Sequence, residues 1–314
     1  MMKESVQQEI GLNPHSPKQL TEAILAVTSN RTGNTQVFIV DAISGDSFNV
    51  SRDSSSHNRY PMWAPDALQI VFTSDRCGTE TYNLYAVDLE SKRVRKLTDV
   101  RRGGICYFPT WHDSKIYFGY DPCDGSEAVI SRINDDGSGF ARIAPGRDPA
   151  ISPDGKSIAF TRKVNAGYCV FRMNVDGTHV TQLTTHENPI GAVTPTWSPD
   201  GTEIVYSDEV GSKLELLLCD RDGHNQRQLT DLRQFATSPA WSPDGLFITF
   251  RVTDYDYWNY PDAKEYAYRE QKADKRPVWI MRADGGEAQI LEALHYQCAI
   301  DGSRAAWKPK VQAR

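Results

Sequence analysis

The sequence predicts an all-β protein made of six repeated four-stranded units, and two observations support this prediction. The first is a short motif, Pro-x-Trp-Ser-Pro-Asp-Gly, which occurs at 195–201 and again at 239–245. Weaker copies begin at residues 61, 109, 149 and 305. The second is the period, because the anchor residues of the first five copies lie 40 to 48 residues apart. A period in the forties with strand-like content is typical of β-propeller blades, so we predict a six-bladed propeller of antiparallel blades.

Each copy of the motif predicts a tight turn between the first two strands of a blade. Proline presets φ, aspartate bonds to the local backbone, and glycine accepts a positive φ. An apolar second strand follows, as at 158–160, and then a third, as at 84–88. An Asp-Gly turn leads to a short last strand that ends in Gln-Leu-Thr at 182–184 and 228–230. The motif tryptophans are expected to pack between blades.

The first blade has no motif copy in front of it. Residues 1–20 are expected to form a flexible arm, and strands are predicted at 23–29 and 37–42. The spare motif copy is the last one, around Trp307. We therefore predict that the C-terminal strand joins the N-terminal blade and closes the ring, so that residues 21–314 form one domain. Blades two to five are predicted at 58–99, 105–144, 147–184 and 193–230.

The sixth blade, predicted at 237–291, contains a long aromatic insertion. The insertion spans 253–276, and it explains why the fifth and sixth anchors, Trp241 and Trp307, lie 66 residues apart. A long loop inside a compact fold is usually functional, and aromatic side chains give contact area at low entropic cost. We expect Tyr255, Trp258 and Tyr260 to contact a ligand or partner.

Composition and charge narrow the class of partner. The formal net charge of −6 and the pI of about 5.7 argue against nucleic acid. No apolar run is long enough for membrane insertion, and the polar N-terminus has no apolar signal region. We expect a cytoplasmic monomer, or a periplasmic one if a signal peptide has been removed. The six cysteines form no Cys-x-x-Cys pair and are expected to be free thiols.

The variable loops of a propeller lie on one face, and this face is expected to carry the site. The tight turns share the opposite face, whereas the blade-to-blade connections run beside the central channel. Side chains from several connections would converge there on a polar or anionic ligand. The expected ligand-binding residues are Arg59, Tyr60, Arg101, Tyr107, Arg147, His186, Gln234 and Gln297, together with the aromatic insertion.

The repeat resembles that of TolB-type β-propellers. The resemblance rests on Trp-Ser-Pro-Asp-Gly, on Ser74-Asp75-Arg76 after the second strand, and on the Asp-Gly and Gln-Leu-Thr segments, and it covers about residues 21 to 309. It implies the fold strongly and function weakly, because propellers host unrelated activities. TolB-type propellers act mainly as platforms for a protein or peptide partner, which implies a binding module.

A second hypothesis is an enzyme, and the sequence leaves this question open. Propeller oligogalacturonate lyases carry similar repeats and a metal site with histidine ligands, although they have seven blades. The resemblance implies that His57, His186 and His295 could hold Ca, Mn or Zn, and that an arginine could grip a uronate carboxylate of an oligosaccharide. The catalytic candidates are His57, His295, Tyr296 and Arg59. A small-molecule tailoring reaction with the same residues is a further alternative.

Overall fold

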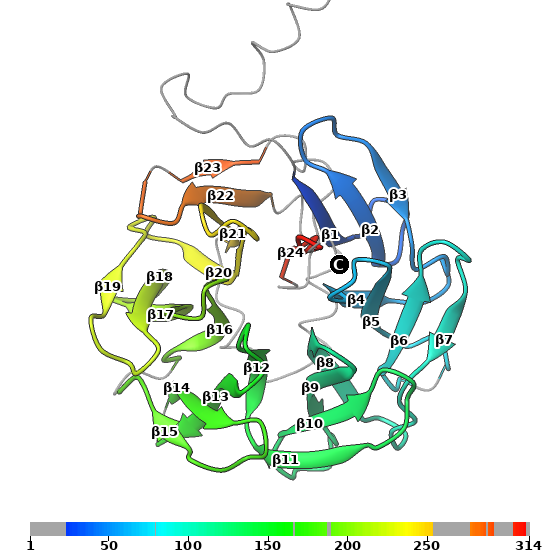
Figure 1. Ribbon diagram of the computed structural model, residues 1–314, viewed down its shortest axis with the longest axis horizontal. Helices are drawn as coiled ribbons and strands as arrows, with labels where there is room; N and C mark the ends of the chain where they lie inside the picture. Colours follow the sequence, from blue (N-terminus) through cyan, green and yellow to red (C-terminus); the bar gives the residue numbers. More distant parts are fainter. Residues whose placement is uncertain are drawn as a thin grey trace, which may run out of the picture.

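The computed structural model of the chain is a ring of β-sheets arranged around a central axis (Figure 1). It describes residues 23–78, 80–165, 167–186, 190–253, 277–286, 288–291 and 304–311. The secondary structure of these residues is entirely β, in 24 strands. No helix in the described ranges is long and apolar enough to cross a membrane. The predicted arm at 1–20 and the predicted insertion, apart from Thr253, lie outside these ranges.

The strands form four-stranded antiparallel groups, which we call blades one to six. Blade one contains β24 (Ala306–Trp307), β1 (Ile24–Ser29), β2 (Gln36–Asp41) and β3 (Ser47–Asn49). Blade two contains β4 (Asn58–Trp63), β5 (Gln69–Ser74), β6 (Asn83–Asp88) and β7 (Val94–Lys96). Blade three contains β8 (Ile105–His112), β9 (Lys115–Asp121), β10 (Val129–Asn134) and β11 (Ala141–Pro145).

The other three blades repeat the same order. Blade four contains β12 (Arg147–Ile151), β13 (Ser157–Val164), β14 (Gly167–Asn174) and β15 (Thr181–Gln182). Blade five contains β16 (Val193–Trp197), β17 (Glu203–Val210), β18 (Lys213–Asp220) and β19 (Arg227–Gln228). Blade six contains β20 (Phe235–Trp241), β21 (Phe247–Thr253), β22 (Val278–Arg282) and β23 (Gln289–Ile290). A parallel bridge between Leu214 and Phe235 joins the sheets of blades five and six.

The C-terminal strand completes the first blade, as the sequence predicts. β24 pairs with β1 in antiparallel register, with Leu25 opposite Trp307 and Ala26 opposite Ala306. Trp307 belongs to an apolar cluster that also contains Val278 and Ile280 of blade six. The two ends of the chain therefore meet in one sheet, and that sheet packs on the last blade (Figure 1).

The Ser-Pro-Asp-Gly turns have the hydrogen bonds that explain their repetition. In blade five, the Ser198 hydroxyl donates to Asp200 Oδ1 at 2.6 Å and accepts from the backbone of Glu203 at 2.9 Å. Gly201 donates to the Ser198 carbonyl at 2.9 Å and has a φ of 71°. Blades four and six have the same bonds around Ser152 and Ser242.

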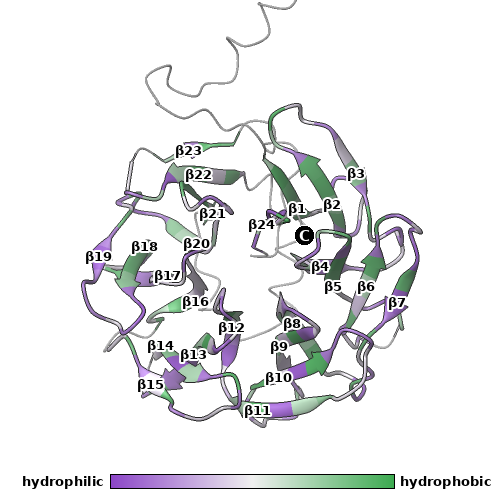
Figure 2. Ribbon diagram, viewed as in Figure 1, coloured by the Kyte–Doolittle hydropathy of each residue, from purple (hydrophilic) through white to green (hydrophobic). Residues whose placement is uncertain are grey.

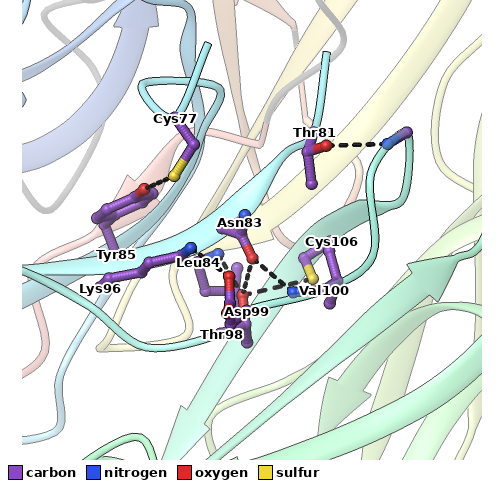
Figure 3. Close-up of polar contacts among 11 residues, drawn as sticks. Cys77, Thr81, Asn83, Leu84, Tyr85, Lys96, Thr98, Asp99, Val100 and Cys106 are labelled. Atoms are coloured by element: carbon purple, nitrogen blue, oxygen red, sulfur yellow. Dashed lines mark hydrogen bonds and ion pairs between the residues drawn. The ribbon is translucent and has the colours of Figure 1, made fainter. Parts of the chain in front are cut away.

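The threonine that ends the last strand of a blade binds the start of the third strand. In blade two, Thr98 Oγ1 accepts from the Leu84 backbone at 2.9 Å and donates to Asn83 Oδ1 at 3.0 Å (Figure 3). Thr184 and Thr230 accept the equivalent backbone bonds, each at 2.9 Å. This shared bond is the structural reason for the threonine of the Leu-Thr pair in blades two, four and five.

Tryptophan side chains join neighbouring blades, as the sequence predicts. The indole of Trp197 in blade five donates to the Ala150 carbonyl of blade four at 3.0 Å. The indole of Trp63 in blade two donates to the Ala306 carbonyl of blade one, also at 3.0 Å. Apolar clusters fill the spaces between blades, and Figure 2 shows the hydrophobic colour along strands such as β1, β2 and β22. The interior is thus a series of inter-blade cores that surrounds the channel.

Candidate functional site: the central channel

Five of the six innermost strands contain the same irregularity, at the residue before a proline. These residues have φ between 46° and 56°, and the pairing with the second strand shifts at the same place. A positive φ is rare for residues other than glycine, and non-glycine residues held there mark strain that the surrounding structure must stabilise. The five residues are Tyr60, Phe108, Asp148, Thr194 and Ser238. Arg304 holds the same place in the sixth strand, three residues before Trp307.

These six residues, which we call the channel layer, contact one another across the ring. The rings of Tyr60 and Phe108 have centroids 4.6 Å apart, and the Arg304 guanidinium lies 6.0 Å from the Phe108 ring. The Ser238 backbone donates to Thr194 Oγ1 at 3.3 Å. The layer therefore contains contacts between neighbouring blades and, through Arg304, between blades one and three.

Arg304 reaches from blade one to blade five. Its Nη2 donates to the carbonyls of Pro195 at 3.0 Å and Thr194 at 3.4 Å. Burial lowers the pKa of Arg304 to about 10, although the carboxylate of Asp148 in blade four opposes the shift. Burial also raises the pKa of Asp148, and the positive charges of Arg147 and Arg304 oppose that change. The layer therefore contains an acidic and a basic group that interact electrostatically.

The channel layer is the floor of a cavity on the tight-turn face. The cavity has a volume of about 1340 Å³. Its walls are the motif tryptophans of five blades, and its rim includes prolines of the tight turns, such as Pro153 and Pro199. Arg304 is the one channel-layer residue that lines it. This cavity lies on the face opposite to the one for which the sequence predicts a site.

On the loop side of the layer, three of the predicted ligand-binding residues come together. Tyr60 contacts Phe108, and the Phe108 ring lies 6.1 Å from that of Tyr107. Arg147, on the next blade, bonds to Asp121 at 3.0 Å and interacts electrostatically with Tyr107. We call Tyr60, Phe108, Tyr107 and Arg147 the mouth cluster.

Tyr107 has a buried polar group inside this cluster. Its hydroxyl has no hydrogen-bond partner within the described part of the chain. Burial raises its pKa, so the hydroxyl stays protonated at neutral pH. The ring lies against Gly119, where an added Cβ would come within 2.5 Å of it. Glycine at this position of β9 therefore allows the ring to lie flat on its own blade.

The other predicted mouth residues that the structure describes lie outside the cluster. Arg101 is exposed and forms an ion pair with Asp124 at 2.8 Å. Gln234 is exposed just before β20. Arg59 lies at the loop-side end of β4, with its guanidinium 5.8 Å from the Tyr82 ring. Each of these residues is at the predicted face, but none of them belongs to the group around Tyr107.

The structure does not bring together His57 and His186, the two described histidines of the predicted metal set. His57 precedes β4, whereas His186 lies between β15 and β16, on the opposite side of the ring (Figure 1). His57 Nδ1 bonds to Thr35 Oγ1 at 3.0 Å. His186 Nε2 contacts Asp208 Oδ1, in a buried pair where burial raises the pKa of the carboxyl. Among the residues that the structure describes, no three His, Cys, Asp or Glu side chains are grouped as metal ligands.

Several predicted residues lie outside the described ranges. They are His295, Tyr296, Gln297, Tyr255, Trp258 and Tyr260. The predicted convergence of three histidines and the predicted aromatic contact surface therefore stay predictions.

The cysteine thiols that the structure describes are free, as expected. Cys77 and Cys123 are exposed at the loop face, whereas Cys106, Cys169 and Cys219 are buried. The Cys77 sulfur lies 2.8 Å from the Tyr85 hydroxyl (Figure 3). No disulfide joins these five residues.

Sequence reasoning missed five of the six residues of the channel layer. Phe108, Asp148, Thr194, Ser238 and Arg304 each stand three residues before the anchor of a repeat. Alignment of the repeats on that anchor would have revealed one channel residue for each blade. Four of these five residues, all except Arg304, have a positive φ, which no local composition signals.

These features define a β-propeller with a layer of side chains at its axis and a cavity on the tight-turn face. Residues 79–244 match the TolB beta propeller domain, over more than half of the chain. The chain therefore belongs to the TolB β-propeller family. It is 24% identical to the uncharacterized protein Atu1656 of Agrobacterium fabrum over 237 residues, 74% of each sequence.

Solved structures share the fold at low sequence identity. TolB from Acinetobacter baumannii is 20% identical, with a TM-score of 0.69, over 94% of this chain and 68% of that one. An oligogalacturonate lyase in complex with manganese is 13% identical, with a TM-score of 0.50, over 87% of this chain and 73% of that one. At these identities the likeness concerns the fold alone.

Proposed function

We propose that this protein is a binding module, which holds an anionic small molecule or oligosaccharide at the mouth cluster. The observation that carries the proposal is the buried Tyr107 hydroxyl, unbonded within the described residues, beside the Arg147 guanidinium. An unsatisfied buried hydroxyl costs about 1–3 kcal/mol, and an acceptor oxygen on a ligand would remove that cost. A carboxylate could accept from the hydroxyl and also interact with the arginine.

The surroundings of the cluster suit a ligand with a polar, charged end. Arg147 is half-buried and already bonded to Asp121, which fixes its position before a ligand arrives. The rings of Tyr60 and Phe108 add flat apolar surface next to the charge. A protein partner that presents an acidic side chain would use the same contacts.

The enzyme hypothesis receives less support from the described residues. A lyase site of the predicted kind needs His57 and His186 at one point, and these residues lie on opposite sides of the ring with partners of their own. The binding hypothesis needs only neighbouring residues of blades two to four. We therefore favour binding over catalysis.

The test is calorimetric titration with trigalacturonate, with maltotriose as the uncharged comparison. We expect the anionic sugar alone to bind. Because a hydrogen bond to a charged group is worth about 1.5–3 kcal/mol, Arg147→Met should weaken binding tenfold or more, and Tyr107→Phe should weaken it less. Arg172→Met removes a similar ion pair, to Asp222 at 2.8 Å, away from the mouth and should leave binding unchanged.

Three outcomes would count against the proposal. They are no binding of trigalacturonate, equal binding of both sugars, and equal loss of binding in the Arg147 and Arg172 variants. Ultraviolet absorbance of an unsaturated sugar product in the same samples would favour the lyase instead.

A further inference from the structure

The tight-turn face contains a cavity of about 1340 Å³. Arg304 of the channel layer lines this cavity, whereas none of the four mouth-cluster residues does. The width of the cavity depends on the innermost strands. The position two residues after each channel-layer residue holds a small side chain in most blades. These residues are Met62, Thr110, Ala150, Thr196, Ala240 and Ala306, and all of them line the cavity.

The floor of this cavity has a buried cation with spare donor capacity. Arg304 is 7% exposed and lines the cavity. Its Nη2 donates to two backbone carbonyls, but Nε has no hydrogen-bond partner among the residues that the structure describes. A guanidinium N–H donates a charge-assisted hydrogen bond to a carboxylate oxygen. An acceptor that enters the cavity would therefore satisfy a group that the described protein residues leave unbonded.

The walls and the rim limit the shape and charge of what could enter. Five tryptophans line the cavity, which favours an aromatic or apolar body. The lining outside the floor includes three aspartates and one lysine, so its net negative charge would repel a ligand with several negative charges; these residues are Asp66, Asp113, Asp135 and Lys310. One carboxylate on an apolar body satisfies both conditions, since the charge lies at the floor and away from the acidic rim.

We propose that this cavity binds small aromatic monocarboxylates, with the carboxylate on Arg304 and the apolar body against the indole walls. This site differs from the mouth cluster in face and in residues, because none of the four mouth-cluster residues lines the cavity. Either site can exist without the other.

The test uses phenylacetate as the probe and phenylacetamide as its uncharged isostere. Five of the seven tryptophans of the chain line the cavity, so binding should change the intrinsic fluorescence. We expect saturable binding of phenylacetate and affinity at least about tenfold lower for the amide, because only the acid forms a charge-assisted pair. Arg304→Met should abolish the preference for the acid.

A second variant keeps the test decisive if the Arg304 variant does not fold. Thr196 is partly exposed and lines the cavity, so Thr196→Phe should fill the space above an intact Arg304. We expect this change to weaken phenylacetate binding tenfold or more. Thr181→Phe is the matched control, because Thr181 is exposed on the outer strand β15.

Several results would overturn the inference. They are no saturable change with phenylacetate up to tens of millimolar, equal affinity for acid and amide, or wild-type affinity in Thr196→Phe. Loss of binding in Arg147→Met would also contradict it, because that residue does not line the cavity. Near-ultraviolet circular dichroism of each variant shows whether the fold is intact.

Discussion

The role of the C-terminal strand can be tested by the change Trp307→Ala. Trp307 is 8% exposed, packs between blades one and six, and donates from its indole to Thr249 Oγ1 at 3.0 Å. Truncation of a buried aromatic side chain to alanine costs about 3–5 kcal/mol in other proteins. Because this indole joins two blades, we expect the free energy of unfolding of the whole ring to fall by an amount in that range.

The assay is equilibrium unfolding in urea followed by far-ultraviolet circular dichroism. Trp197→Ala is the internal reference, because Trp197 is 6% exposed and bonds to Ala150 in the interior of the ring. If β24 is an integral strand, the two variants should lose similar stability in one transition. With an m-value of about 3 kcal/mol/M, this loss would lower the midpoint by about 1–1.7 M. A loss below about 1 kcal/mol for Trp307→Ala alone would refute the reasoning.

Two further predictions concern a thiol and a turn. Burial raises the pKa of Cys106 to about 12, so a disulfide reagent at pH 8 should modify exposed Cys77 rapidly and Cys106 only after unfolding. The variant Cys77→Ser should lack one rapid phase of labelling, and labelling of Cys106 in the native protein would contradict the prediction. The hydrogen bond from Ser198 holds the pKa of Asp200 in the folded protein below its ordinary value. The bond therefore stabilises the fold at pH values above the pKa of Asp200 in the unfolded chain, and this stabilisation is lost as the pH falls through the pKa of Asp200 in the folded protein. Ser198→Ala should raise the pKa of Asp200 in an NMR titration. Because the carboxylate is exposed, the variant should lose at most about 1 kcal/mol of the free energy of unfolding near pH 6, and less near pH 2. Equal losses at the two pH values would be inconsistent with this prediction.

Local chemistry explains why so much of the fold could be predicted from the sequence. The Ser198–Asp200–Gly201 bonds lie within one turn, so the residues that form them are adjacent in the chain. The closure by β24 could also be predicted, because the number of motif copies left one strand unpaired at each end of the chain. Both inferences depend on short stretches or on counting, and neither requires the direction of a side chain.

The site was harder to predict because it depends on positions around the ring. His57 and His186 lie in connections three blades apart, and in a ring of six such positions are opposite one another. Counting blades would have shown this separation. The cavity on the tight-turn face could not be predicted in the same way, because it results from small residues at non-adjacent positions, such as Ala150 and Ala240.

The channel-layer position has a consequence for how this protein can change over evolution. It lies three residues before the anchor of each repeat, and anchor tryptophans such as Trp197 bond to the neighbouring blade. A substitution at such a position alters the axis without altering a turn or an inter-blade core. Duplicated blades, which start identical, can therefore diverge at this residue first, as the present set of two aromatics, an acid, two hydroxyls and a base illustrates. Ligand preference can thus change one blade at a time.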